Sequence, residues 1–160
     1  MNSDQIYETS KLLTDLWIKG SIIEKLPEKN CPQNRKDAYK VQSFFKKLSA
    51  QPLFGWKAAA TRASKKKLTK IEGPIAGCLL AERQLENHGT CSLKSNHMCV
   101  AEAEFAFKMD QDFLPRDKPY TIEEIISGVA SLHPAIEIPN TRLGNFTDAD
   151  APQIIADNAL

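Results

Sequence analysis

Two glutamates on one face of a strand have the clearest chemical potential in this sequence. In segment 98–109, Glu102 and Glu104 point to one side, while Ala103 and Phe105 point to an apolar side that we expect to pack on a core. Neighbouring like charges repel unless a positive charge lies between them, and a divalent cation would supply it. Carboxylates are hard ligands, which favours magnesium, manganese or calcium. The alternative is a half-exposed strand whose glutamates face water, and the pair alone favours that alternative.

A third glutamate strengthens the metal interpretation. Glu137 lies between Ile136 and Ile138 in the apolar segment 134–139, where an acidic side chain tends to be buried and then needs a partner. Three glutamates from two strands would hold one side of an ion and leave positions open for water or substrate.

Lys57 is the one charged residue of the apolar segment 53–60. In a pocket it could hold a substrate carboxylate or transfer a proton, because burial makes a lysine easier to deprotonate. The alternative is a lysine whose stem lies along apolar surface while its ammonium group stays in water.

A rival metal set consists of His88, Cys91, His97 and Cys99, since zinc sites use histidine and cysteine. Their spacing matches no common zinc motif, so we expect these side chains to have unrelated roles. The four cysteines of the chain contain no Cys-x-x-Cys pair, and we expect reduced thiols.

The composition is that of one globular chain of 160 residues, with 42% hydrophobic and 26% charged residues. The net charge of +1 is not the strong positive charge that is typical of a nucleic-acid-binding protein. The basic run Lys65–Lys67 with Lys70 is interpreted as a solvated face rather than a phosphate site. We find no signal peptide and no apolar stretch that would span a membrane, and we therefore expect a cytoplasmic enzyme.

Helices are expected before the first strong strand. The first begins at a cap formed by Ser3 or Asp4 and ends at Gly20, and the second covers residues 35–48. Strands are expected at 52–60, 75–81 and 98–109, with a weak one at 90–93.

The remaining elements begin with a helix over residues 120–132, where Thr121 and Glu124 form a capping box. A strand at 133–138 follows, and Asp148 or Asp150 caps a last helix. This order predicts an α+β fold with a mixed sheet. We expect an N-terminal helical segment over residues 1–50 and the front part of a β-rich catalytic domain over residues 51–160.

Six short motifs in a fixed order resemble one known family, from about residue 35 to the end. They are Asp37-Ala38-Tyr39 with Val41-Gln42, Gly55-Trp56-Lys57, the Pro-x-x-Gly turn Pro74 to Gly77, Glu102 to Phe107, Pro134 to Glu137 with Arg142, and Ala156-Asp157-Asn158-Ala159. The family is the 2-keto-4-pentenoate hydratase and 4-oxalocrotonate decarboxylase group of the fumarylacetoacetate hydrolase superfamily.

The resemblance implies a β-roll with a Mg²⁺ or Mn²⁺ site held by Glu102, Glu104 and Glu137, and an active-site role for Lys57. It implies that water is added to 2-hydroxypenta-2,4-dienoate, giving 4-hydroxy-2-oxopentanoate, in the catabolism of aromatic compounds. The alternatives within the superfamily are a 4-oxalocrotonate decarboxylase and an acylpyruvate-type hydrolase.

Two departures from the family pattern affect these expectations. Ile75 and Ala76 stand where family members often carry an acid. Family chains also continue beyond the last motif, so we expect an incomplete sheet with unpaired edges. We therefore expect a marginally folded chain, or association with a second copy or a related chain. A further alternative is an inactive remnant that assembles with a full-length partner.

Overall fold

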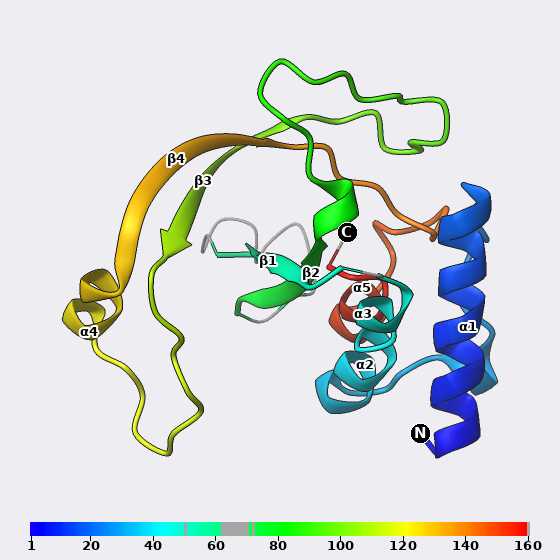
Figure 1. Ribbon diagram of the computed structural model, residues 1–160. Coiled ribbons are helices and arrows are strands. Elements are labelled where there is room, and N and C mark those ends of the chain that lie inside the picture. The colour runs from blue at the N-terminus through cyan, green and yellow to red at the C-terminus, as the bar shows by residue number, and fades with distance from the viewer. Residues whose placement is uncertain (50, 62–70, 72, 160) are drawn as a thin grey trace. The chain divides into compact units, whose positions relative to one another are not determined.

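The computed structural model describes residues 1–49, 51–61, 71 and 73–159, and these divide into two compact units (Figure 1). The helix-rich unit comprises Met1–Met98 and Asn140–Leu160, and the hairpin unit comprises Cys99–Pro139. This grouping differs from the segments 1–50 and 51–160, because the helix-rich unit takes residues from both. The basic run Lys65–Lys67 with Lys70 lies outside the described residues.

Helix α1 (Ser3–Lys19) begins one or two residues earlier than the sequence suggested. Asn2, rather than Ser3 or Asp4, is its N-cap. The Asn2 side chain accepts from the Gln5 amide at 2.8 Å, and the Asn2 amide donates to the Gln5 side-chain oxygen at 2.9 Å. At the other end Gly20 adopts the left-handed conformation, with φ of 61°, as the sequence predicted.

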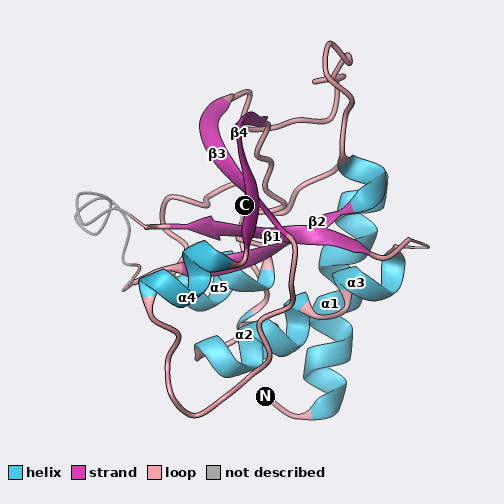
Figure 2. Ribbon diagram, turned by 60° about the vertical axis from the view of Figure 1, so that its left-hand side comes forward, coloured by secondary structure: helices cyan, strands magenta, loops and turns pink. Residues whose placement is uncertain are grey.

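The helix predicted over residues 35–48 is two helices, α2 (Arg35–Gln42) and α3 (Phe45–Leu48). The break lies at Ser43, whose hydroxyl group donates to the Lys40 carbonyl at 2.7 Å. Serine side chains compete in this way with the backbone ladder, and periodicity alone does not reveal such a break. Figures 1 and 2 both show α5 (Ala151–Ala156) beside α2, and α5 is capped by Asp150, one of the two predicted residues.

The core of the helix-rich unit joins these helices to a strand pair. Strand β1 (Leu53–Ala59) pairs antiparallel with β2 (Ile75–Leu80), whereas residues 90–93 form no strand. The most completely buried apolar side chains come from both ends of the chain: Leu13, Val41, Phe45, Ile75, Leu143 and Ile155.

Side chains cover the edge of β2 that faces away from β1. The Tyr39 hydroxyl accepts from the Ala76 amide at 3.0 Å, and Gln42 donates to the Ala76 carbonyl at 2.7 Å. Asn158 accepts from the Cys78 amide at 2.7 Å and donates to the Cys78 carbonyl at 3.0 Å. Unpaired edges were expected, but here polar side chains satisfy the backbone groups that a further strand would otherwise take.

A buried ion pair ties the segment after the hairpin unit to the end of α5. The Arg142 Nε atom lies 2.5 Å from Asp157 Oδ1, and the Thr141 hydroxyl donates to Oδ2 of the same carboxylate at 2.8 Å. Burial raises the pKa of Asp157, and Arg142 opposes that shift. Asp157 therefore has well-defined structural contacts in this unit.

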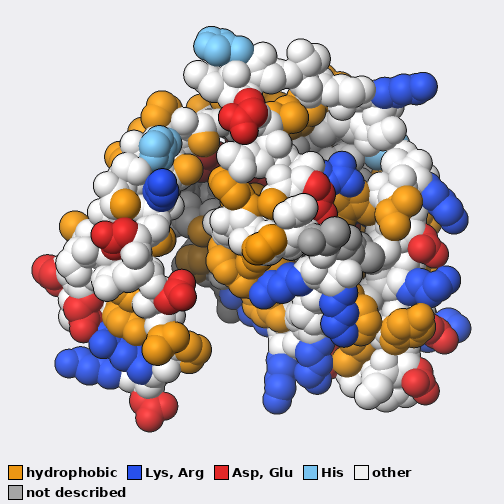
Figure 3. All heavy atoms as spheres, in the orientation of Figure 1, with side chains coloured by type: hydrophobic (Ala, Val, Ile, Leu, Met, Phe, Trp, Pro, Cys, Tyr) orange, Lys and Arg blue, Asp and Glu red, His pale blue; other side chains and the backbone are white. Residues whose placement is uncertain are grey.

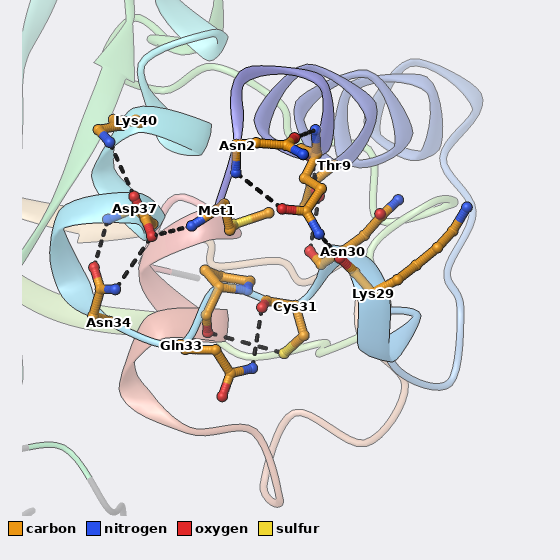
Figure 4. Close-up of polar contacts among 12 residues, drawn as sticks. Met1, Asn2, Thr9, Lys29, Asn30, Cys31, Gln33, Asn34, Asp37 and Lys40 are labelled. Atoms are coloured by element: carbon orange, nitrogen blue, oxygen red, sulfur yellow. Dashed lines mark hydrogen bonds and ion pairs between the residues drawn. The ribbon is translucent and has the colours of Figure 1, made fainter.

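The N-terminal amine makes a second ion pair, shown in Figure 4. The Met1 nitrogen lies 2.6 Å from Asp37 Oδ2, and Lys40 donates to Oδ1 at 3.0 Å. Asn34 donates to Oδ2 at 3.2 Å. The amine, followed by Lys40, holds the pKa of Asp37 well below its usual range.

The hairpin unit contains β3 (Glu102–Met109), α4 (Ile122–Ser127) and β4 (Val129–Glu137). The predicted capping box of Thr121 and Glu124 is confirmed. The helix predicted over 120–132 ends early, because Gly128 terminates α4 and β4 begins at the β-branched Val129. The first residues of β4 therefore form a strand paired with β3, although their apolar spacing is helical.

The apolar face of β3 does not pack on a core, contrary to our expectation. Phe105 is 72% exposed, Phe107 62% and Ile136 75%. Within its described residues the unit has one antiparallel strand pair and one short helix, so no second layer covers this face. Figure 3 shows hydrophobic side chains reaching the surface, and α4 also contributes exposed ones, Ile122 and Ile126.

The fold class predicted from the sequence, α+β, is confirmed. In the described part of the chain the strands form two separate antiparallel pairs, with one isolated parallel bridge between Ile23 and Leu143. None of the helices described is both long and apolar enough to cross a bilayer. All four cysteines are free thiols.

Candidate metal centre

The register of the β3–β4 pair brings three glutamates together. Glu102 stands directly opposite Glu137, and Glu104, two residues along the same face, stands opposite Ala135. Each of the three carboxylates offers an oxygen atom, and these atoms all lie within 4.8 Å of one another. Residues far apart in the sequence therefore form one acidic cluster, which we call the glutamate triad.

The triad lies on the less exposed face of the hairpin unit. Glu102 and Glu137 are half-buried, and Glu104 is exposed. The sequence suggested a buried Glu137, and its environment is intermediate because a two-stranded pair covers its face only in part. Three carboxylates at this separation repel one another, and a cation placed between them would remove the repulsion.

The chemistry of the donors fits a hard divalent cation. Carboxylate oxygens suit Mg²⁺, Mn²⁺ and Ca²⁺, and magnesium in particular keeps several coordination positions for water or substrate oxygens. Three protein ligands would leave such positions open. The rival set of His88, Cys91, His97 and Cys99 forms no such group among the described residues. His97 instead contacts the Gly20 carbonyl at 3.2 Å through Nε2.

The face that carries the triad continues with residues that the sequence analysis did not single out. His133 stands opposite Ala106, and Ser131 stands opposite Lys108. The Ser131 hydroxyl lies 2.7 Å from His133 Nε2. The alternation of Ser131, His133 and Glu137 along one segment could have indicated that they share a strand face. The helix predicted up to residue 132 led us to miss this alternation.

Lys57 lies in the helix-rich unit, on β1. It is half-buried and pairs with Gly77 on β2. A Cβ added at Gly77 would lie 2.8 Å from Lys57 Cε and would also meet the Asn158 carbonyl, so the absence of a side chain at Gly77 makes room for the lysine stem. The motif from Pro74 to Gly77 was expected to form a turn, but it enters β2, which begins at Ile75.

The fold of this chain is similar to that of several solved structures. The solved structures that share it include two of 4-oxalocrotonate decarboxylase from Pseudomonas putida. One, complexed with magnesium and adipate, superposes with a TM-score of 0.84 at 21% identity and covers 99% of this chain. The other, complexed with calcium and acetate, gives 0.82 at 20% identity with the same coverage.

In both comparisons the chain spans 60% of the length of the solved structure. The sequence matches no protein family model and no curated protein. The likeness to these enzymes is therefore a likeness of fold.

Proposed function

We propose that this chain is a divalent-metal-dependent hydratase. It adds water to 2-hydroxypenta-2,4-dienoate to give 4-hydroxy-2-oxopentanoate, with Mg²⁺ or Mn²⁺ held by Glu102, Glu104 and Glu137. The observation that carries the proposal is the glutamate triad, whose ligand oxygens lie within 4.8 Å of one another on one face of a strand pair.

The glutamate triad and Lys57 would have different roles in this reaction. A divalent cation at the glutamate triad would supply an electron sink for the bound 2-oxo acid. Glu102, Glu104 and Glu137 would hold that cation. Lys57 supplies a positive charge for the developing enolate and is the candidate for proton transfer, a role that rests on the family resemblance.

The solved structures of similar fold support the metal assignment, because they are complexed with magnesium in one case and calcium in the other. Both are named decarboxylases, which makes decarboxylation of 4-oxalocrotonate the second candidate reaction. An acylpyruvate-type hydrolase and an inactive remnant remain weaker alternatives.

The exposed apolar face of the hairpin unit supports association as part of this proposal. Phe105, Phe107 and Ile136 form a surface that a second copy of this chain or a related chain would cover. We further propose a cytoplasmic protein acting on small 2-oxo or 2-hydroxydienoic acids in the catabolism of aromatic compounds, without nucleic-acid or membrane partners.

The full chain is tested with 2-hydroxypenta-2,4-dienoate, with and without Mg²⁺. Metal-dependent formation of 4-hydroxy-2-oxopentanoate supports the hydratase, whereas carbon dioxide release from 4-oxalocrotonate supports the decarboxylase. Absence of both activities in a chain that binds Mg²⁺ argues for the remnant. Lys57→Met should lower kcat without changing the affinity for Mg²⁺, and Lys46→Met serves as its matched control on the same unit.

A further inference from the structure

The polar face of the β3–β4 pair continues past the glutamate triad in regular rows. Beyond the row of Glu104 and Ala135 comes the row of Ala106 and His133, because the register is unbroken between these positions. Rows on one face of a strand repeat every two residues, which is about 7 Å. A group bound at the triad therefore has His133 as its neighbour one row away.

Contact with Ser131 orients the His133 ring. The serine hydroxyl lies 2.7 Å from Nε2, and with the hydroxyl as donor the ring carries its hydrogen on Nδ1. In that tautomer Nδ1 can donate to an oxygen atom of a ligand without the ring becoming charged. A neutral donor suits a hydroxyl oxygen or a water molecule.

The residues between the triad and His133 are small. Ala135 stands next to Glu104, and Ala106 stands opposite His133, so neither side chain extends far above the strand pair. A short acyl chain bound through its acid end at the triad can therefore lie over these alanines. Its distal atoms would then reach the imidazole.

We propose that His133, oriented by Ser131, hydrogen-bonds the oxygen that hydration places on C4 of the substrate and is a specificity-determining residue of the site. The inference rests on the proposed function, because it requires the 2-oxo acid to be bound through the metal at the glutamate triad. The diene substrate carries no oxygen on C4, so this contact discriminates the hydrated product from acids that lack the C4 hydroxyl group, such as 2-oxopentanoate. Ser131 is a positioning residue, since it acts through the ring.

The test compares two ligands that differ by one hydroxyl group. Binding of 4-hydroxy-2-oxopentanoate and of 2-oxopentanoate to the full chain is measured by calorimetry at saturating Mg²⁺. The wild type should bind the hydroxy acid about fivefold to tenfold more tightly, the range expected for one hydrogen bond. His133→Ala should abolish that preference and leave the affinities for Mg²⁺ and 2-oxopentanoate unchanged. His133→Gln, which keeps a donor, should retain part of it, and Ser131→Ala should reduce it.

His88→Ala, at an exposed histidine of the other unit, should behave as the wild type. If the wild type binds the two acids with equal affinity, the inference is overturned and the proposed function stands. The same holds if His133→Ala loses affinity equally for both acids. If Mg²⁺ itself fails to bind, the proposed function fails and the inference fails with it. Tighter binding of 2-oxoadipate that depends on His133 would also overturn the inference, because the ring would then serve a distal carboxylate.

Discussion

Glu102 faces Glu137 directly across the β3–β4 pair, in a position where two like charges destabilise a strand pair. This arrangement predicts that the sign of a mutational effect depends on metal. Without divalent ions, Glu137→Gln should raise the free energy of unfolding by about 0.2–1 kcal/mol, because it removes the cross-strand repulsion. With Mg²⁺ present, the same substitution should lower stability relative to the wild type, because it removes a ligand. Urea unfolding in EDTA and in Mg²⁺ measures both, and Glu86→Gln, an exposed acid elsewhere, should show no such reversal.

Metal binding should itself stabilise the chain. At a hundredfold excess of Mg²⁺ over its dissociation constant, the free energy of unfolding should rise by about 2.7 kcal/mol. Thermal unfolding across a Mg²⁺ titration measures this gain, which Glu102→Gln should reduce. A wild-type Tm that is unchanged by Mg²⁺, Mn²⁺ and Ca²⁺ would exclude the metal centre.

Asn158 should contribute to stability through its two hydrogen bonds to Cys78. Asn158→Ala leaves buried backbone groups of β2 unpaired, each at a cost of about 1–3 kcal/mol. The residue also has φ of 63°, where alanine is strained. Asn158→Gly keeps that conformation accessible, so the loss that alanine and glycine share reports the hydrogen bonds. A glycine variant as stable as the wild type would show that they contribute little.

Gly77 should tolerate no side chain. Gly77→Ala would crowd Lys57 and the Asn158 carbonyl, and such overpacking typically costs about 1–3 kcal/mol. Gly55→Ala on the paired strand is the matched control, because its nearest neighbour lies at an ordinary 3.7 Å. Urea midpoints compare the two variants, and equal losses would contradict a specific role for the space at Gly77.

The ion pair of Asp37 with the N-terminal amine predicts an acid-dependent loss of stability. Because the folded state holds the pKa of Asp37 below its ordinary value, the stabilisation is present above that value and is lost as the pH falls through the folded pKa. Asp37→Asn should lower the urea midpoint at pH 6 and flatten its fall toward pH 3. Acetylation of the amine should act in the same direction, since it removes the positive partner. An unchanged pH profile in Asp37→Asn would assign the acid sensitivity to other carboxylates.

Local patterns predicted most of the elements correctly. The left-handed Gly20 and the capping box of Thr121 and Glu124 depend on neighbouring residues, and both are found where the sequence indicated them. The two misses have different causes. The helix over residues 35–48 is interrupted by a local hydrogen bond from Ser43 to Lys40, whereas Val129 joins a strand because β3 offers a partner.

For the site, alternation alone placed Glu102 and Glu104 on one face, because successive side chains of a strand point to opposite sides. The identity of the donors, and with it the preference for a hard cation, also follows from the sequence. Only the tertiary structure decided that Glu137 stands opposite Glu102 and that His133 continues the same face. The register of two strands far apart in the chain is set by their pairing, and no local pattern contains it.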